Sequence, residues 1–180
     1  MIAETAERYV YVIDRDDRIV NVSPEWLRFA EENDAPELTA DRVVGQSIWN
    51  FITGDDSREF YASIFGNLRL RGTDITIPFR CDSPTVVRQM KLTLRLLPEG
   101  KIDCEGVLLQ ARIREPITVL FRWVIRTDET IPICSLCRRL SVQGEWLELR
   151  DAVTRAGIVN AAPVPRLEET ICPTCNCIAK

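Results

Sequence analysis

The sequence predicts an α+β protein: a five-stranded antiparallel sheet with short helices on one face, and a small four-cysteine metal-binding C-terminal region that contains one helix. Three observations lead to this fold class. Several short segments alternate apolar and polar residues, as strands do. A second segment places its apolar residues on one helical face: Phe60, Tyr61, Ile64, Phe65 and Leu68. Two Cys-x-x-Cys pairs follow near the C-terminus, a spacing typical of metal sites.

The first predicted elements are a β-hairpin and a helix. Residues 9–13 and 19–22 are apolar runs, and the polar segment between them suits a turn. Ser23 and Pro24 then match the N-cap and the first position of a helix, which we expect to fade near Asn33.

The longest predicted helix begins near Asp55, in a run of capping residues, and ends at Gly72. Three predicted strands follow it. Each alternates apolar with polar side chains, which indicates an antiparallel sheet covered on one face. The apolar positions are Ile75, Ile77 and Phe79; Met90, Leu92, Leu94 and Leu96; and Val107, Leu109, Ala111 and Ile113.

Composition limits the chemistry that this chain can perform. Its 180 residues include 23 basic and 27 acidic side chains, seven Cys and no His. A Ser–His–Asp or Cys–His nucleophile and a mixed Cys/His zinc site are therefore excluded. We expect a protein that is not an enzyme, whose metal is held by thiolates or carboxylates.

The sequence predicts a cytoplasmic protein that does not enter a membrane. No apolar run approaches the roughly 18 residues of a membrane-spanning helix. The N-terminus lacks the basic and apolar regions of a signal peptide. Seven cysteines cannot all pair, and five of them cluster late in the chain, which favours a reduced protein over a disulfide framework.

The order of two strands, short helices and three strands resembles the PAS domain, a small sensory α/β module with a five-stranded antiparallel sheet. The resemblance covers about residues 8–114 and is carried by the strand 9–14, by 21–24 entering a helix, and by 44–52. The segment 79–84 also resembles a signature of bacterial PAS proteins of unknown activity. The resemblance implies a bacterial sensory module that binds a small ligand or a signalling protein and forms a homodimer.

PAS modules often hold ligands between helices and sheet, and the resemblance therefore implies a pocket. The candidate lining residues are Trp49, Phe65, Met90, Leu92 and Leu109. The alternative for Trp49 is a place in the hydrophobic core. We expect the isolated Cys81 and Cys104 to be packing residues, because buried cysteine usually acts as a small apolar side chain.

Cys134 and Cys137 form one Cys-x-x-Cys pair, and Cys172 and Cys175 form another after 34 intervening residues. Two residues between thiolates let one tight turn aim both sulfurs at a single ion, and two such turns complete a tetrahedral shell. The spacing predicts a structural zinc site. An iron–sulfur cluster, a redox-active dithiol and simple reduced thiols are the alternatives, and Cys177 could replace Cys175.

Residues 133–177 resemble a cysteine-rich tail found after PAS, receiver and related sensory domains in bacteria. The matching segments are 133–139, 144–146 and 171–175. That family usually has His three positions before the third Cys, where this chain has Glu169. Between the pairs we expect a helix. Its apolar face would carry Trp146, Leu149, Val153 and Ala156, and Gly157 would end it.

The sequence therefore predicts a sensory domain at residues 1–114, a connector at 115–132 and a zinc-binding region at 133–180. The apolar run 117–125 could extend the last strand, form a helix or pack against a second subunit. Alternative functions are a thiol-redox sensor that uses the Cys-x-x-Cys pairs and a nucleic-acid-binding zinc protein. Nucleic acid is disfavoured as a partner, because residues 115–180 carry no basic surplus.

Overall fold

The computed structural model describes residues 7–159 and 161–179. Residues 1–6, on which most of the signal-peptide prediction rests, lie outside this range. No helix in the described part combines the length and the apolar character needed to cross a membrane.

The chain groups into two compact units, each assembled from several segments. Unit 1 comprises Met1–Thr53, Tyr61–Pro78 and Met90–Leu109, and unit 2 comprises Gly54–Phe60, Phe79–Gln89 and Gln110–Lys180. Several elements thus begin in one unit and continue into the other. The domain bounds expected from the sequence, 1–114, 115–132 and 133–180, stay a prediction.

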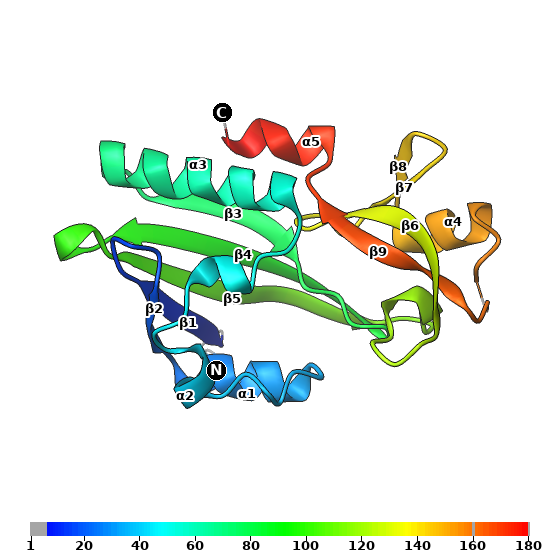
Figure 1. The fold of residues 1–180 in the computed structure, drawn as a ribbon, viewed down its shortest axis with the longest axis horizontal. Coiled ribbons are helices and arrows are strands. Elements are labelled where there is room, and N and C mark those ends of the chain that lie inside the picture. The colour runs from blue at the N-terminus through cyan, green and yellow to red at the C-terminus, as the bar shows by residue number, and fades with distance from the viewer. Residues whose placement is uncertain (1–6, 160, 180) are drawn as a thin grey trace, which may run out of the picture. The chain divides into compact units, whose positions relative to one another are not determined.

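A five-stranded sheet confirms the predicted fold class. Its strands are β1 (Arg8–Ile13), β2 (Ile19–Val22), β3 (Ile75–Arg80), β4 (Val86–Leu96) and β5 (Ile102–Ile113). They lie in the order β2-β1-β5-β4-β3 (Figure 1). The sheet is antiparallel, and its register pairs Ile13 of β1 with Ile19 and with Ile102. A short 3-10 turn, η2 (Pro98–Gly100), joins β4 to β5.

Helix α1 (Pro24–Glu32) begins where its capping residues predict. It follows Ser23, whose hydroxyl accepts a hydrogen bond from the Trp26 amide, and α1 packs on β1. Helix α2 (Ala40–Val43) and the 3-10 turn η1 (Ile48–Asn50) lead to the long helix α3 (Asp55–Arg71). The largest fully buried side chains of unit 1 come from α2, α3 and the strands: Ile13, Val43, Ile64, Phe65, Leu68, Ile77, Leu94 and Ile102.

Polar contacts around Asp17 fasten the turns of unit 1 to α3. Asp17 has a positive φ of 60° in the β1–β2 turn. Its carboxylate accepts hydrogen bonds from Arg69 at 2.7 Å and from the Trp49 indole at 3.1 Å. Arg69 also donates to the carbonyl oxygens of Asp14 and Gly100. Trp49 is thereby held in place, and its ring lies 5.8 Å from that of Phe65.

Unit 2 contains a second, four-stranded sheet. Its strands are β6 (Arg126–Cys134), β7 (Leu140–Val142), β8 (Glu145–Leu147) and β9 (Val164–Thr170), in the order β8-β7-β6-β9. Strands β6 and β9 are parallel, whereas β7 is antiparallel to both of its neighbours. The chain ends in α5 (Pro173–Asn176) and the 3-10 turn η4 (Cys177–Ala179).

The helix expected around residues 146–156 is shorter than predicted. Helix α4 spans Leu149–Arg155, while Trp146 belongs to β8. Gln143 and Gly144 both adopt positive φ values, and the tight turn they form reverses the chain between β7 and β8. The apolar face of α4 remains as expected, with Leu149 and Val153 in the core of unit 2.

The apolar run 117–125 neither extends β5 nor forms a connector helix. It contains only a 3-10 turn, η3 (Thr118–Leu120), within irregular backbone. Val119 and Val124 are buried in the core of unit 2. Trp123 and Ile125 are 78% and 72% exposed. Leu120 and Phe121 are partly buried and also pack against this core, so most apolar residues of the run belong to unit 2.

The burial along α3 predicts a clear contrast between two leucines. Leu68 is fully buried, whereas Leu70 is 83% exposed. We expect Leu68→Ala to lower the free energy of unfolding by about 2–5 kcal/mol, because the substitution leaves a cavity. Leu70→Ala should change it by no more than about 0.5 kcal/mol. Urea unfolding followed by circular dichroism measures both, and equal losses would contradict this packing.

Candidate metal centre

The four cysteines of the two Cys-x-x-Cys pairs converge on one point in unit 2. All four Sγ atoms lie within 4.8 Å of one another. The Sγ atoms of Cys137 and Cys172, one from each pair, are 3.7 Å apart. A tetrahedral shell with metal–sulfur bonds of about 2.3 Å requires sulfur–sulfur distances of about 3.8 Å. The arrangement therefore fits a tetrahedral four-thiolate metal ion.

The first pair lies in the tight turn between β6 and β7. Cys134 is the last residue of β6. Its carbonyl accepts a hydrogen bond from the Arg138 amide, and its amide donates to the Arg139 carbonyl, both at 2.9 Å. Arg138 takes a positive φ of 61°, which lets the chain reverse within this short span. The turn thus presents Cys134 and Cys137 on the same side.

The second pair lies where β9 leads into α5. Cys172 precedes α5, with Pro173 at the first helical position, and Cys175 lies within this helix. The Asn176 amide donates to the Cys172 carbonyl at 3.0 Å and closes the turn. The Cys172 amide donates to the Sγ of Cys134 at 3.4 Å, so one pair directly supports a sulfur of the other.

Parallel pairing between β6 and β9 brings the two pairs together. Cys134 lies opposite Thr170 in this register, so β6 and β9 end side by side at the same end of the sheet. Just beyond this end, the Ser135 amide donates to the Thr170 carbonyl at 2.8 Å. The two cysteine turns are therefore neighbours, although 34 residues separate the pairs in the sequence.

The environment of the sulfurs favours a bound cation. Cys134, Cys172 and Cys175 are buried, and Cys137 is partly buried. A hydrogen bond with Cys137 lowers the pKa of Cys134, and the same bond raises the pKa of Cys137. Burial raises the pKa of Cys175 to about 12. A divalent ion that binds all four sulfurs would displace the protons of the thiols as it binds.

Glu169 and Cys177 lie outside the group of four ligands found among the described residues. Glu169 accepts hydrogen bonds from Ser135 at 2.7 Å and from Arg138 at 2.9 Å, so it supports the first turn. Cys177 is exposed, and its thiol lies 3.4 Å from the Pro173 carbonyl oxygen. Cys175, which is buried within the group of four, is therefore a better ligand candidate than Cys177.

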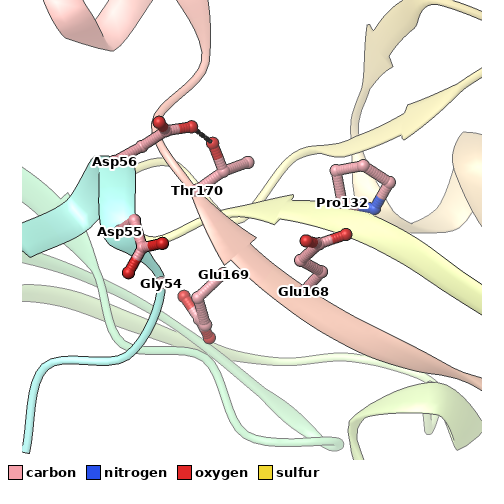
Figure 2. A pocket seen from close by; sticks show the side chains of 7 residues that line it. All are labelled: Gly54, Asp55, Asp56, Pro132, Glu168, Glu169 and Thr170. Atoms are coloured by element: carbon pink, nitrogen blue, oxygen red, sulfur yellow. Dashed lines mark hydrogen bonds between the residues drawn. The ribbon is translucent and has the colours of Figure 1, made fainter.

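A polar pocket of about 470 Å³ also lies in unit 2. It is lined by Gly54, Asp55, Asp56, Pro132, Glu168, Glu169 and Thr170. Figure 2 shows the carboxylates of its four acidic residues around the end of β9 and the start of α3, with Asp56 hydrogen-bonded to Thr170. The sequence does not predict this pocket, because its residues come from three distant segments with no shared motif.

The predicted ligand-pocket residues of unit 1 do not all lie in one environment. Phe65, Met90 and Leu92 are buried, and Trp49 is half-buried. Leu109 is 60% exposed and does not join them. Alternation along β5 explains this error: Ile102 and Cys104 are fully buried, so even-numbered positions face inward and Leu109 faces out.

The two isolated cysteines behave as packing residues rather than reactive thiols. Cys104 is fully buried in β5, and burial raises its pKa to about 12. Burial also raises the pKa of Cys81, which follows β3. Both thiols therefore stay protonated near neutral pH.

Comparisons with known proteins find similarity only among solved structures. No protein-family model matches the chain, and no curated protein matches it either. Two solved structures of the PAS domain of the Cronobacter turicensis RpfR quorum-sensing receptor, in complex with C12:0 and with BDSF, are similar to it. Each has 16% identity and a TM-score of 0.39, and covers 61% of this chain and 100% of the PAS domain chain.

The cluster predicts a defined metal content. Freshly purified protein should contain about one equivalent of metal. Cys134→Ser should lose most of it and melt at a lower temperature, because it removes a buried ligand. Cys177→Ser should retain both the metal and the melting temperature, because Cys177 lies outside the cluster. Elemental analysis with thermal melts checks this, and less than about half an equivalent in the wild type would exclude the site.

Proposed function

We propose that this protein is a bacterial cytoplasmic sensory or regulatory module. In this proposal the PAS-like unit binds a small ligand or a signalling protein, and the four cysteines hold a structural zinc ion. The observation that carries the proposal is the convergence of four sulfurs within 4.8 Å at the ends of β6 and β9.

The donor set supports zinc in a structural role. Cys134, Cys137, Cys172 and Cys175 would occupy all four positions of a tetrahedral ion and leave none for water or substrate. Such a closed shell stabilises a fold but does not activate a nucleophile. We therefore infer that the chain is not an enzyme. The absence of disulfides among its seven cysteines supports a reducing, cytoplasmic location.

The sensory part of the proposal is supported by unit 1. Its strand order and its capped helices agree with the PAS resemblance over residues 8–114. Phe65, Met90 and Leu92 lie in its apolar interior, and the half-buried Trp49 contacts Phe65. An apolar interior with one aromatic residue near its surface suits a small, mostly apolar ligand.

A ligand in this interior predicts a contrast between two matched substitutions. We expect native mass spectrometry of gently purified protein to show a mass excess beyond that of the metal. Met90→Trp should abolish this excess by filling the interior, whereas Leu109→Trp should retain it, because Leu109 is exposed. A wild-type protein that carries no small molecule and captures no protein partner would argue strongly against a sensory role.

The predicted homodimer is supported by the exposed apolar residues of unit 2. Trp123 and Ile125 lie close together in sequence and are 78% and 72% exposed, so both side chains are accessible to a second chain. We expect light scattering after size-exclusion chromatography to give the mass of two chains. Trp123→Ser should shift the equilibrium toward one chain. A wild-type protein that remains monomeric at high concentration would defeat the dimer hypothesis.

A further inference from the structure

The turn that carries the first cysteine pair is hydrogen-bonded to the start of α3. Ser57 lies in the first turn of α3 and is only 1% exposed. Its hydroxyl lies 2.7 Å from that of Ser135, which stands between Cys134 and Cys137. Ser135 in turn lies 2.7 Å from a carboxylate oxygen of Glu169. A continuous chain of polar groups therefore joins α3 to the cysteine turn.

The hydrogen bonds of this polar network all donate in one direction, from Ser57 to Ser135 and from Ser135 to Glu169. The Glu169 carboxylate accepts, so the single hydroxyl hydrogen of Ser135 is donated to it. The Ser135 oxygen then accepts from Ser57. The other carboxylate oxygen of Glu169 accepts from Arg138 at 2.9 Å, and Arg138 also belongs to the cysteine turn. Glu169 is thus held from two points of that turn.

Two further contacts fasten the start of α3 to the end of β9. Asp56 and Thr170 are hydrogen-bonded (Figure 2). Gly54 has a positive φ of 80°, and a Cβ built there would lie 1.9 Å from the Glu169 carbonyl oxygen. Any side chain at position 54 would push the two segments apart. The close approach of the two segments therefore depends on glycine at position 54. This approach fixes the spacing between the start of α3 and the end of β9, which the hydrogen bonds of Ser57, Ser135 and Glu169 span.

We infer that the Ser57–Ser135–Glu169 chain couples the state of the metal centre to the first turn of α3. This inference rests on the proposed metal site. A bound ion fixes the backbone of Cys134 and Cys137, and with it the position of the Ser135 hydroxyl. Loss of the ion frees that turn, so Ser57 and Glu169 lose a partner whose position the ion had fixed.

The coupling has a route beyond the cysteine region. Helix α3 starts in unit 2 and continues through Tyr61–Arg71 of unit 1, where Phe65 and Leu68 are buried. The Arg80 amide, at the end of β3, donates to the Leu136 carbonyl inside the same cysteine turn at 2.7 Å. The turn is thus bonded to two elements that continue into the five-stranded sheet unit.

Thermodynamic reciprocity supplies a test that needs only the folded, metal-loaded protein. If the metal stabilises the first turn of α3, then that turn stabilises the metal by the same factor. We expect Ser57→Ala and Glu169→Gln to weaken the affinity for the metal by about tenfold, measured at equilibrium in competition with a chromogenic chelator. Ser63→Ala, an exposed serine on the same helix, should leave the metal affinity unchanged.

Hydrogen exchange tests the opposite direction of the coupling. Removing the metal from reduced wild-type protein should speed amide exchange in residues 55–60 about tenfold, with little change in α1 as the internal reference. In Ser57→Ala the exchange of 55–60 should already be fast with metal bound, and metal removal should add little.

The outcomes separate this inference from the proposed function. One bound metal with unchanged metal affinity in Ser57→Ala and Glu169→Gln would overturn the coupling and leave the zinc site standing. Unchanged exchange of residues 55–60 after metal removal would do the same. A wild-type protein without metal would overturn both proposals.

Discussion

The parallel pairing of β6 with β9 is the constraint on which the cysteine region depends. It sets Cys134 opposite Thr170, so that each strand leads into its cysteine pair at the same end of the sheet. The hydrogen bond from Ser135 to Thr170 and that from Cys172 to the Cys134 sulfur then lock the two turns together. A shift of the strand register by one residue would move Cys134 to the other face of the sheet and separate the four sulfurs.

The same end of the sheet also positions the residues around the four-cysteine cluster. Glu169, one position before the end of β9, lies outside this cluster. It accepts hydrogen bonds from Ser135 and Arg138 and so supports the first cysteine turn. Groups that position metal ligands commonly matter almost as much as the ligands themselves. A glutamate at this position is therefore compatible with a shell of four thiolates.

Much of the fold could be predicted from local patterns, and the errors have physical causes. Ser23 and Pro24 start α1 as expected, because a cap acts within one helical turn. The spacing of Trp146 from Leu149 and Val153 suits a helix, but the turn at Gln143 and Gly144 puts Trp146 in a strand. Leu109 is 60% exposed, because it does not share the buried face of β5 to which Cys104 belongs.

By itself the sequence determined the thiolate chemistry of the site, the absence of imidazole, the strand and helix periods and the helix caps. Each depends on residue type or on spacing within a few positions. Only the tertiary structure decided that Cys175 rather than Cys177 joins the group of four, where Glu169 is directed and why Gly54 is needed beside it. Those features depend on a strand register and on close backbone approach between segments over 100 residues apart, which local periodicity does not encode.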